Sequence, residues 1–160
     1  MRVRHLIADR KIQGNDTGWR TDDMPPRACP IFTKTRPIRA GWQWRSVPAD
    51  SDTKRYLLVA LVNPNRGNWQ SYLLVDVLGA WSVVARFEYH ASHPGTHLHS
   101  HCGRSGVEVG ATGLDQLARA PAIGRRHRRT AAYTPSTFWQ AARTIFRIHD
   151  DLGPLYNGLS

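Results

Sequence analysis

The sequence predicts an α+β fold, in which an antiparallel four-stranded β-meander is packed by a C-terminal helix and preceded by an extended N-terminal arm. Residues 38–90 hold four short apolar runs separated by turn-like clusters. Thr134-Pro135 is a typical helix start, and residues 1–37 show no sustained period of 2 or 3.6. At 160 residues the chain has room for one α+β domain, which we assign to residues 38–160.

Residues 1–37 are predicted to form an irregular arm. Glycine and proline recur among polar residues from Ile12 to Pro37, which favours neither helix nor strand. The few apolar residues of this stretch, Trp19, Ile31 and Phe32, are suited to anchoring the arm on the domain or on a partner.

The chain lacks the signals of secretion or membrane insertion. Its N-terminus carries charge but no apolar run of signal-peptide length, and no segment approaches the ~20 apolar residues that cross a bilayer. Cys29 and Cys102 form no CxxC pair, so a reducing compartment is expected. We therefore expect a soluble cytoplasmic protein with no membrane contact.

The meander is predicted from runs at residues 38–47, 55–62, 71–78 and 81–90. Tyr56–Val62 is apolar at every position, which favours a central strand covered on both faces. In the fourth run one face is apolar and the other becomes polar towards its end. The apolar set is Trp81, Val83, Ala85, Phe87 and Tyr89, and the alternate set is Ser82, Val84, Arg86, Glu88 and His90.

The C-terminal helix is predicted to run from Thr134 to about His149. Threonine is a favoured N-cap, and proline is favoured at the first helical position. An apolar stripe at helical spacing indicates the face that packs on the sheet; it consists of Phe138, Trp139, Ala142, Ile145, Phe146 and His149. A short helix at Leu114–Arg119 precedes it.

Five of the 8 histidines lie in the histidine-rich segment, residues 90–102, at His90, His93, His97, His99 and His101. Histidine titrates near neutral pH and is the commonest metal ligand. His97, His99 and His101 alternate, so in an extended segment their imidazoles point to one side. Three imidazoles with an open position suit zinc or another divalent metal. Glu88, His90, His93, Cys102 and Glu108 are candidates for a further ligand.

The same segment also suits metal-free chemistry with no cofactor. Cleavage of RNA needs a base for the 2′-hydroxyl, an acid for the leaving oxygen, and cations for the developing phosphate charge. Arg86 would stabilise phosphate charge, Glu88 would orient an imidazole, and His97, His99 or His101 would act as acid and base, with His90 beside them. An endoribonuclease is one interpretation, a metal-dependent enzyme the second, and a loop of merely exposed histidines a third.

Charge favours a polyanionic partner. Lys and Arg number 22 against 12 Asp and Glu, which gives a formal net charge of +10. Arg125, Arg126, Arg128 and Arg129 form a basic run suited to bidentate phosphate contacts that add affinity without sequence selection. Nucleic acid and an acidic protein both fit, so a non-catalytic nucleic-acid-binding module is also an open alternative.

The stretch Arg86–His101 resembles the TumE-like toxins of bacterial toxin–antitoxin pairs, in which a β-meander ends in an arginine-aromatic-acid strand and a histidine-rich segment before a C-terminal helix. The matching positions are Arg86, Glu88, His90, His93, His97, His99 and His101. The resemblance implies a toxin that acts on RNA and is held by an antitoxin protein. This chain departs from those toxins in its greater length, its N-terminal arm and the region 103–129 inserted before the helix.

Pro94–His99 also resembles the opening of a cupin metal motif, which places HxH on a barrel strand. A cupin needs a glutamate a few residues after HxH, whereas Glu108 comes late in this chain. The remaining strands of a cupin barrel are not predicted either.

Overall fold

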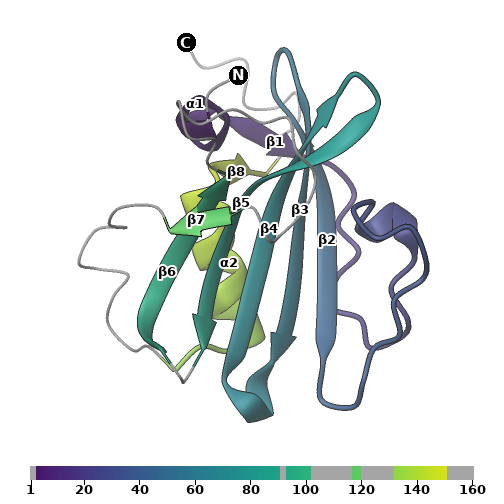
Figure 1. Cartoon of the computed structure of the whole chain (residues 1–160), viewed down its shortest axis with the longest axis vertical. Coiled ribbons are helices and arrows are strands. Elements are labelled where there is room, and N and C mark those ends of the chain that lie inside the picture. The colour runs from purple at the N-terminus through teal and green to yellow at the C-terminus, as the bar shows by residue number, and fades with distance from the viewer. Residues whose placement is uncertain (1–2, 91–92, 102–116, 120–131, 151–160) are drawn as a thin grey trace.

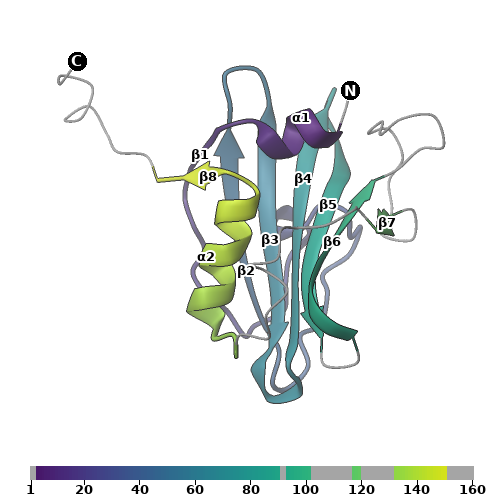
Figure 2. The same cartoon turned by 90° about the vertical axis from the view of Figure 1, so that its left-hand side faces the viewer.

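The computed structural model describes residues 3–90, 93–101, 117–119 and 132–150 (Figure 1). These residues form an eight-stranded sheet in the order β7-β6-β5-β4-β3-β2-β1-β8, with α2 against one face (Figure 2). Neighbouring strands are antiparallel except β1 and β8, which are parallel. The elements are α1 (Val3–Ala8), β1 (Lys11–Gln13), η1 (Pro26–Ala28), β2 (Gln43–Asp50), β3 (Arg55–Asn63), η2 (Pro64–Arg66), β4 (Asn68–Val77), β5 (Ala80–His90), β6 (His93–His101), β7 (Leu117–Arg119), α2 (Pro135–Ile145) and β8 (Ile148–His149).

The predicted four-stranded antiparallel meander is wrong, because the sheet is wider and mixed. β2 to β5 overlap the four predicted strands, although β2 spans Gln43–Asp50 and the prediction was 38–47. β6 and β7 extend the sheet past β5, and β1 and β8 extend it past β2. The histidine segment forms β6, although it lacks the Val and Ile that usually indicate a strand. Leu117–Arg119 was expected to be helical but forms β7. Its three residues are too few to show the alternation of apolar and polar residues that indicates a strand.

Strand β3 is covered on both faces, as its apolar run predicts. Tyr56, Leu58, Ala60 and Val62 belong to the core beneath α2. Leu57, Val59 and Leu61 belong to a second apolar cluster on the opposite face. Because successive strand residues point to opposite faces, an apolar residue at every position produces this two-sided burial.

Helix α2 begins where the sequence predicts. Thr134 is its N-cap, and the Thr134 and Thr137 side chains each hydrogen-bond the other residue's backbone N–H, forming a capping box. The helix ends at Ile145 rather than near His149, because Arg147 adopts a left-handed backbone (φ 53°) that turns the chain into β8. Phe138 and Trp139 are fully buried against the sheet.

The capping box gives a stability prediction. Thr134→Ala removes the side-chain acceptor of the Thr137 N–H, so we expect the free energy of unfolding to fall by about 1 kcal/mol. Chemical denaturation of the purified protein measures the change. Ser136→Ala is the matched control, because Ser136 is an exposed hydroxyl residue in the same first turn with no capping role. Equal stability of the two variants would contradict the capping role of Thr134.

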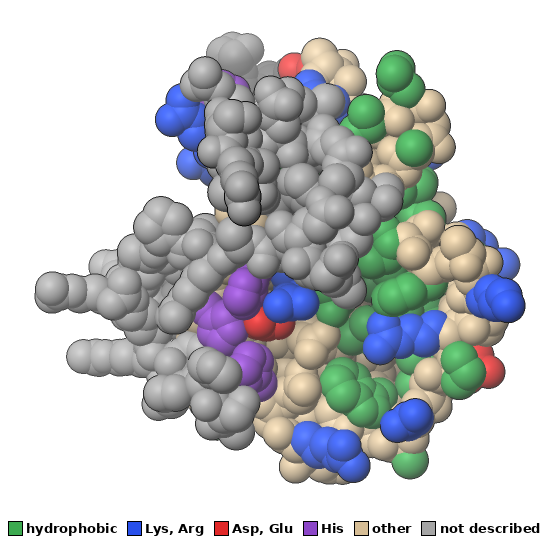
Figure 3. Space-filling view, in the orientation of Figure 1, with side chains coloured by type: hydrophobic (Ala, Val, Ile, Leu, Met, Phe, Trp, Pro, Cys, Tyr) green, Lys and Arg blue, Asp and Glu red, His purple; other side chains and the backbone are tan. Residues whose placement is uncertain are grey.

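The face opposite α2 is covered at its centre by residues 24–42. Met24, Ala28 and Cys29 are buried there against Val59 and Tyr72. Ile31 and Phe32 pack against the same cluster, as predicted for anchors of the arm. Figure 3 views this face, on which hydrophobic side chains lie among Lys and Arg in the right half.

The N-terminal arm is not simply extended, which corrects the prediction. Helix α1 buries Val3 and Leu6 in the core, and β1 pairs with both β2 and β8. Lys11 is fully buried, and its ammonium donates hydrogen bonds to the carbonyls of Ile7, Asp9 and Phe146 at 3.3, 2.7 and 2.9 Å. The sequence did not predict α1, because its six residues make fewer than two helical turns and so show no helical period.

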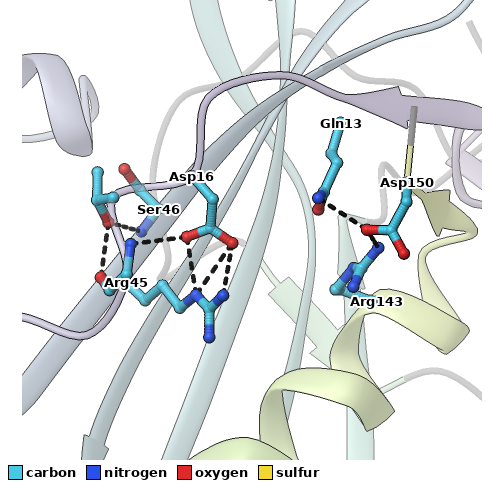
Figure 4. A network of polar contacts seen from close by, with 8 residues as sticks. Gln13, Asp16, Arg45, Ser46, Arg143 and Asp150 are labelled. Carbon is cyan, nitrogen blue, oxygen red and sulfur yellow. Dashed lines mark hydrogen bonds and ion pairs between the residues drawn. The ribbon is translucent and has the colours of Figure 1, made fainter. Parts of the chain in front are cut away.

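Hydrogen bonds and an ion pair connect the N-terminal segment to the rest of the fold (Figure 4). Asp16 forms a bidentate ion pair with Arg45 of β2, with contacts of 2.7 to 3.1 Å. Asp150, after β8, accepts hydrogen bonds from Gln13 of β1 and Arg143 of α2, both at 2.8 Å. These contacts connect the arm, β2 and α2.

No helix among the described residues has the length and apolarity needed to cross a membrane.

Candidate metal centre

The register between β5 and β6 gathers the candidate residues. Glu88 pairs with His97 and Arg86 pairs with His99. Directly opposite residues in neighbouring strands share a face of the sheet, so these four side chains lie together. The intervening pair, Phe87 and Leu98, contributes to the core beneath α2. The cluster therefore lies on the face away from the helix.

Alternate side chains of β6 point to opposite faces of the sheet, and packing fixes which of them face α2. The Thr96 hydroxyl is 3.0 Å from the Tyr133 hydroxyl, and Leu98 packs on the main core. His97 and His99 alternate with them and project to the other side. Figure 3 shows histidine side chains gathered around an acidic one, with a basic side chain next to it, on that surface.

A buried carboxylate is the centre of the cluster. The Glu88 side chain is 5% exposed. Its Oε1 lies 3.0 Å from His97 Nε2, 2.8 Å from His99 Nε2 and 3.8 Å from His90 Nε2. Arg86 holds the same carboxylate, with Nε 2.7 Å from Oε2 and Nη2 3.2 Å from Oε1. Three imidazoles and one guanidinium thus surround a single acidic group.

The imidazole rings stand edge-to-face around Glu88. The His90 and His97 centroids are 5.0 Å apart with an interplanar angle of 85°, and those of His97 and His99 are 5.1 Å apart at 75°. The register shifts between Glu88 and His90, where His90 pairs with His93. This irregularity lies within the cluster, and such irregularities often re-aim side chains next to functional sites.

The arrangement can hold a metal ion. One ligand atom from each of Glu88, His90 and His97 lies within 4.8 Å of the others. Bonds of about 2.0–2.2 Å to an ion place ligand atoms about 3–3.5 Å apart, so the cluster needs only small side-chain adjustments. The sequence predicted His97, His99 and His101 as the ligands. Of these the structure places His97 in the donor group and His99 beside it.

Glu88 and His90 belong to the group that could hold a metal ion, but they were not in the main ligand set predicted from the sequence. They come from the strand before the histidine segment, and the signal for them was the polar face of the fourth run. Their contact with His97 depends on how β5 and β6 are aligned, and spacing along the chain does not give that alignment.

The surroundings of His99 favour its neutral form. Burial lowers the pKa of His99, and the positive charge of Arg86 and the neighbouring His97 act in the same direction, against the attraction of Glu88. An imidazole must be neutral to coordinate a metal or to accept a proton.

A row of polar side chains on β4 borders the cluster. Tyr72, Gln70 and Asn68 pair with Arg86, Glu88 and His90 across β4 and β5. The Tyr72 hydroxyl donates to Gln70 Oε1 at 2.6 Å, and Gln70 Nε2 donates to Asn68 Oδ1 at 3.1 Å. Burial raises the pKa of the Tyr72 hydroxyl to about 12, so it stays a donor well above neutral pH. These hydrogen bonds hold the polar side chains of β4 in place next to Glu88.

Several predicted residues lie outside the described part of the chain. They are Cys102, Glu108 and the basic run Arg125, Arg126, Arg128 and Arg129. His93 and His101 lie on β6, where His101 pairs with Leu117, but their side chains are outside what the structure describes. Comparison with protein family models, curated proteins and solved structures gives no match to this chain.

Proposed function

We propose that the protein is a metal-dependent hydrolase in which Glu88, His90 and His97 bind a divalent metal such as zinc. One observation carries this proposal: the Nε2 atoms of three histidines converge on one oxygen of a buried carboxylate. The contacts of His97 and His99 with Glu88 are 3.0 and 2.8 Å long, and His90 Nε2 lies 3.8 Å from the same oxygen. Convergence of all three rings favours a shared ion.

The donor set suits catalysis more than structural binding. Two imidazoles and one carboxylate are a known ligand set of catalytic zinc sites, and they leave a position for water or substrate. A divalent metal there supplies Lewis acidity and lowers the pKa of coordinated water. The side chains of His90 and His99 are 25% and 20% exposed, so a substrate can reach them.

Arg86 and His99 support the ligands in this proposal. Arg86 contacts both oxygens of Glu88 and so fixes the orientation of the carboxylate. The lowered pKa of His99 favours its neutral form, so this adjacent imidazole can accept a proton from a water that attacks the substrate. Replacing His99 would therefore affect turnover more than metal affinity.

The proposed substrate is RNA. A net charge of +10 favours a polyanion. The resemblance of Arg86–His101 to TumE-like toxins points to the same substrate and to an antitoxin protein as partner. Hydrolysis of a phosphodiester is within the chemistry that one metal and a neighbouring base provide.

A metal-free ribonuclease is the second candidate, and the direct contacts of Glu88 favour it. Its carboxylate lies within hydrogen-bond distance of His97 and His99, at 3.0 and 2.8 Å, and so can orient both rings. Arg86 adds a cation next to them. This candidate requires no ion.

Incubation of the purified protein with total bacterial RNA tests both candidates. We expect cleavage that stops with a strong chelator and returns when zinc is added back. His97→Ala should abolish it, because one ligand is lost. His149→Ala is the matched control, since His149 is an exposed histidine on β8 at the other edge of the sheet. Cleavage that survives chelation but stops in His97→Ala would support the metal-free ribonuclease. No cleavage in any sample would contradict both candidates.

A further inference from the structure

A hollow lies on the sheet face that carries the metal centre, away from the metal centre itself. Its volume is about 410 Å³, and it is walled by β2, β3, the start of β5 and residues 17–28. Volumes of about 300–1,000 Å³ are typical of small-molecule sites. Trp81 at its edge is seven residues before Glu88 on the same strand, or about 23 Å at 3.3 Å per residue. The hollow is therefore separate from the metal centre.

Two tryptophans, Trp44 and Trp81, line the hollow. Trp44 is 2% exposed, its Nε1 donates to the Asp22 carbonyl at 2.7 Å, and the Arg20 guanidinium lies 5.7 Å from its ring centre. Trp44 is thus held in place. Trp81 is only partly buried and packs on the second apolar cluster, so its indole is available at the edge of the hollow. A flat ring stacked on Trp81 would cover its remaining exposed surface.

The charged side chains that line the hollow differ in whether other side chains already bind them. Arg20 is bound by Asp22 through two hydrogen bonds of 2.8 and 2.7 Å. Arg55 is 73% exposed and meets Asp76 only at 3.6 Å. Arg27 and Asp50 also line the hollow, and within the described part of the chain no side-chain hydrogen bond or ion pair engages them. Arg27 and Asp50 are therefore available to a ligand, and the exposed Arg55 can reach one while it remains paired with Asp76.

We propose that this hollow binds a mononucleotide. Guanidinium groups bind phosphate through paired N–H donors, which assigns the phosphate to Arg27 and Arg55. Indole rings stack on bases, which assigns the base to Trp81. The Asp50 carboxylate accepts hydrogen bonds from N–H groups on the edge of the base. The arginines, Trp81 and Asp50 thus each have a counterpart in one ligand.

Isothermal titration calorimetry of the whole chain tests the proposal with guanosine 5′-monophosphate, whose base edge presents two adjacent N–H donors. Guanosine, ribose 5-phosphate and inorganic phosphate are the comparison ligands. We expect the nucleotide to bind at least about tenfold more tightly than each of them, because only it engages both the arginines and Trp81. Absence of nucleotide binding, or equal binding of ribose 5-phosphate or inorganic phosphate, would overturn the proposal.

Variants locate the binding site. Arg27→Ala should weaken nucleotide binding at least about tenfold, and its exposed position makes loss of folding unexpected. Trp81→Leu should weaken it comparably while keeping an apolar side chain on the cluster. Arg66→Ala, at an exposed arginine of η2 at the opposite end of β3, is the control and should bind as the unaltered protein does. Unchanged affinity of Arg27→Ala would overturn the assignment, whereas His97→Ala should leave binding intact whether or not the metal centre exists.

Discussion

Zinc affinity is expected to fall at least about 100-fold when His97 is replaced by alanine. His97 lies between the other two rings, 5.0 Å from His90 and 5.1 Å from His99 by ring centroids, and its Nε2 is 3.0 Å from Glu88 Oε1. Removal of this imidazole takes away a ligand that neither neighbour can replace without moving its strand. Competition titration against a colorimetric zinc chelator measures the affinity.

The control for this titration is His149→Ala, which removes an exposed histidine of β8 and leaves the cluster intact. It should bind zinc as tightly as the unaltered protein. Equal affinities of His97→Ala and His149→Ala would mean that zinc binds elsewhere. Near-identical circular dichroism spectra and melting temperatures of the two variants exclude unfolding as the cause of a difference.

The largest stability effect is expected at Phe138. Its ring is fully buried and stacks on the ring of Phe87, with centroids 5.5 Å apart. The ring centroids of Trp69 and Tyr133 lie 5.6 and 5.3 Å from that of Phe138. Phe138→Ala leaves a cavity between α2 and the sheet, so the free energy of unfolding should fall by about 3–5 kcal/mol. Domains of this size are stable by only about 5–15 kcal/mol, so the variant should be close to unfolding.

Urea denaturation measures this effect. Gln140→Ala is the control, because Gln140 is exposed on the same helix and its replacement should change stability by no more than about 0.5 kcal/mol. A loss below about 1 kcal/mol for Phe138→Ala would contradict the packing of α2 on the sheet.

The elements that the sequence predicted well are those with strong local signals. The apolar run Tyr56–Val62 indicated a doubly covered strand, and Thr134-Pro135 indicated the start of α2. The strands it missed are short or polar. β1, β7 and β8 hold three, three and two residues, and β6 is dominated by histidine, so neither period nor composition identified them as strands.

An irregularity also changed the predicted faces of the fourth run. The register between β4 and β5 shifts at Leu73/Leu74, and Val84 has no partner in the pairing. Trp81 consequently packs on the second cluster with Leu74, whereas Ala85 and Phe87 face α2. A single extra residue reverses the alternation of everything beyond it, and no residue type in the sequence marks that position.

The candidate site was predictable in part. The histidine segment drew attention to His97 and His99, and the polar end of the fourth run to Arg86, Glu88 and His90. Their assembly around Glu88 Oε1 depends on the pairing of Glu88 with His97 across two strands. Cross-strand register is set by the turn and by bulges rather than by composition, so the three-histidine ligand set was the natural prediction from the sequence.

Metal analysis of the purified protein tests the central claim most directly. After extensive dialysis, elemental analysis should find about one divalent metal ion per chain, and a Glu88→Ala/His97→Ala double variant should hold none because it lacks two of the three ligands. Zinc added to stripped protein should restore the same stoichiometry. Absence of metal from the purified protein, together with no uptake of zinc on titration, would contradict the assignment of the cluster as a metal centre.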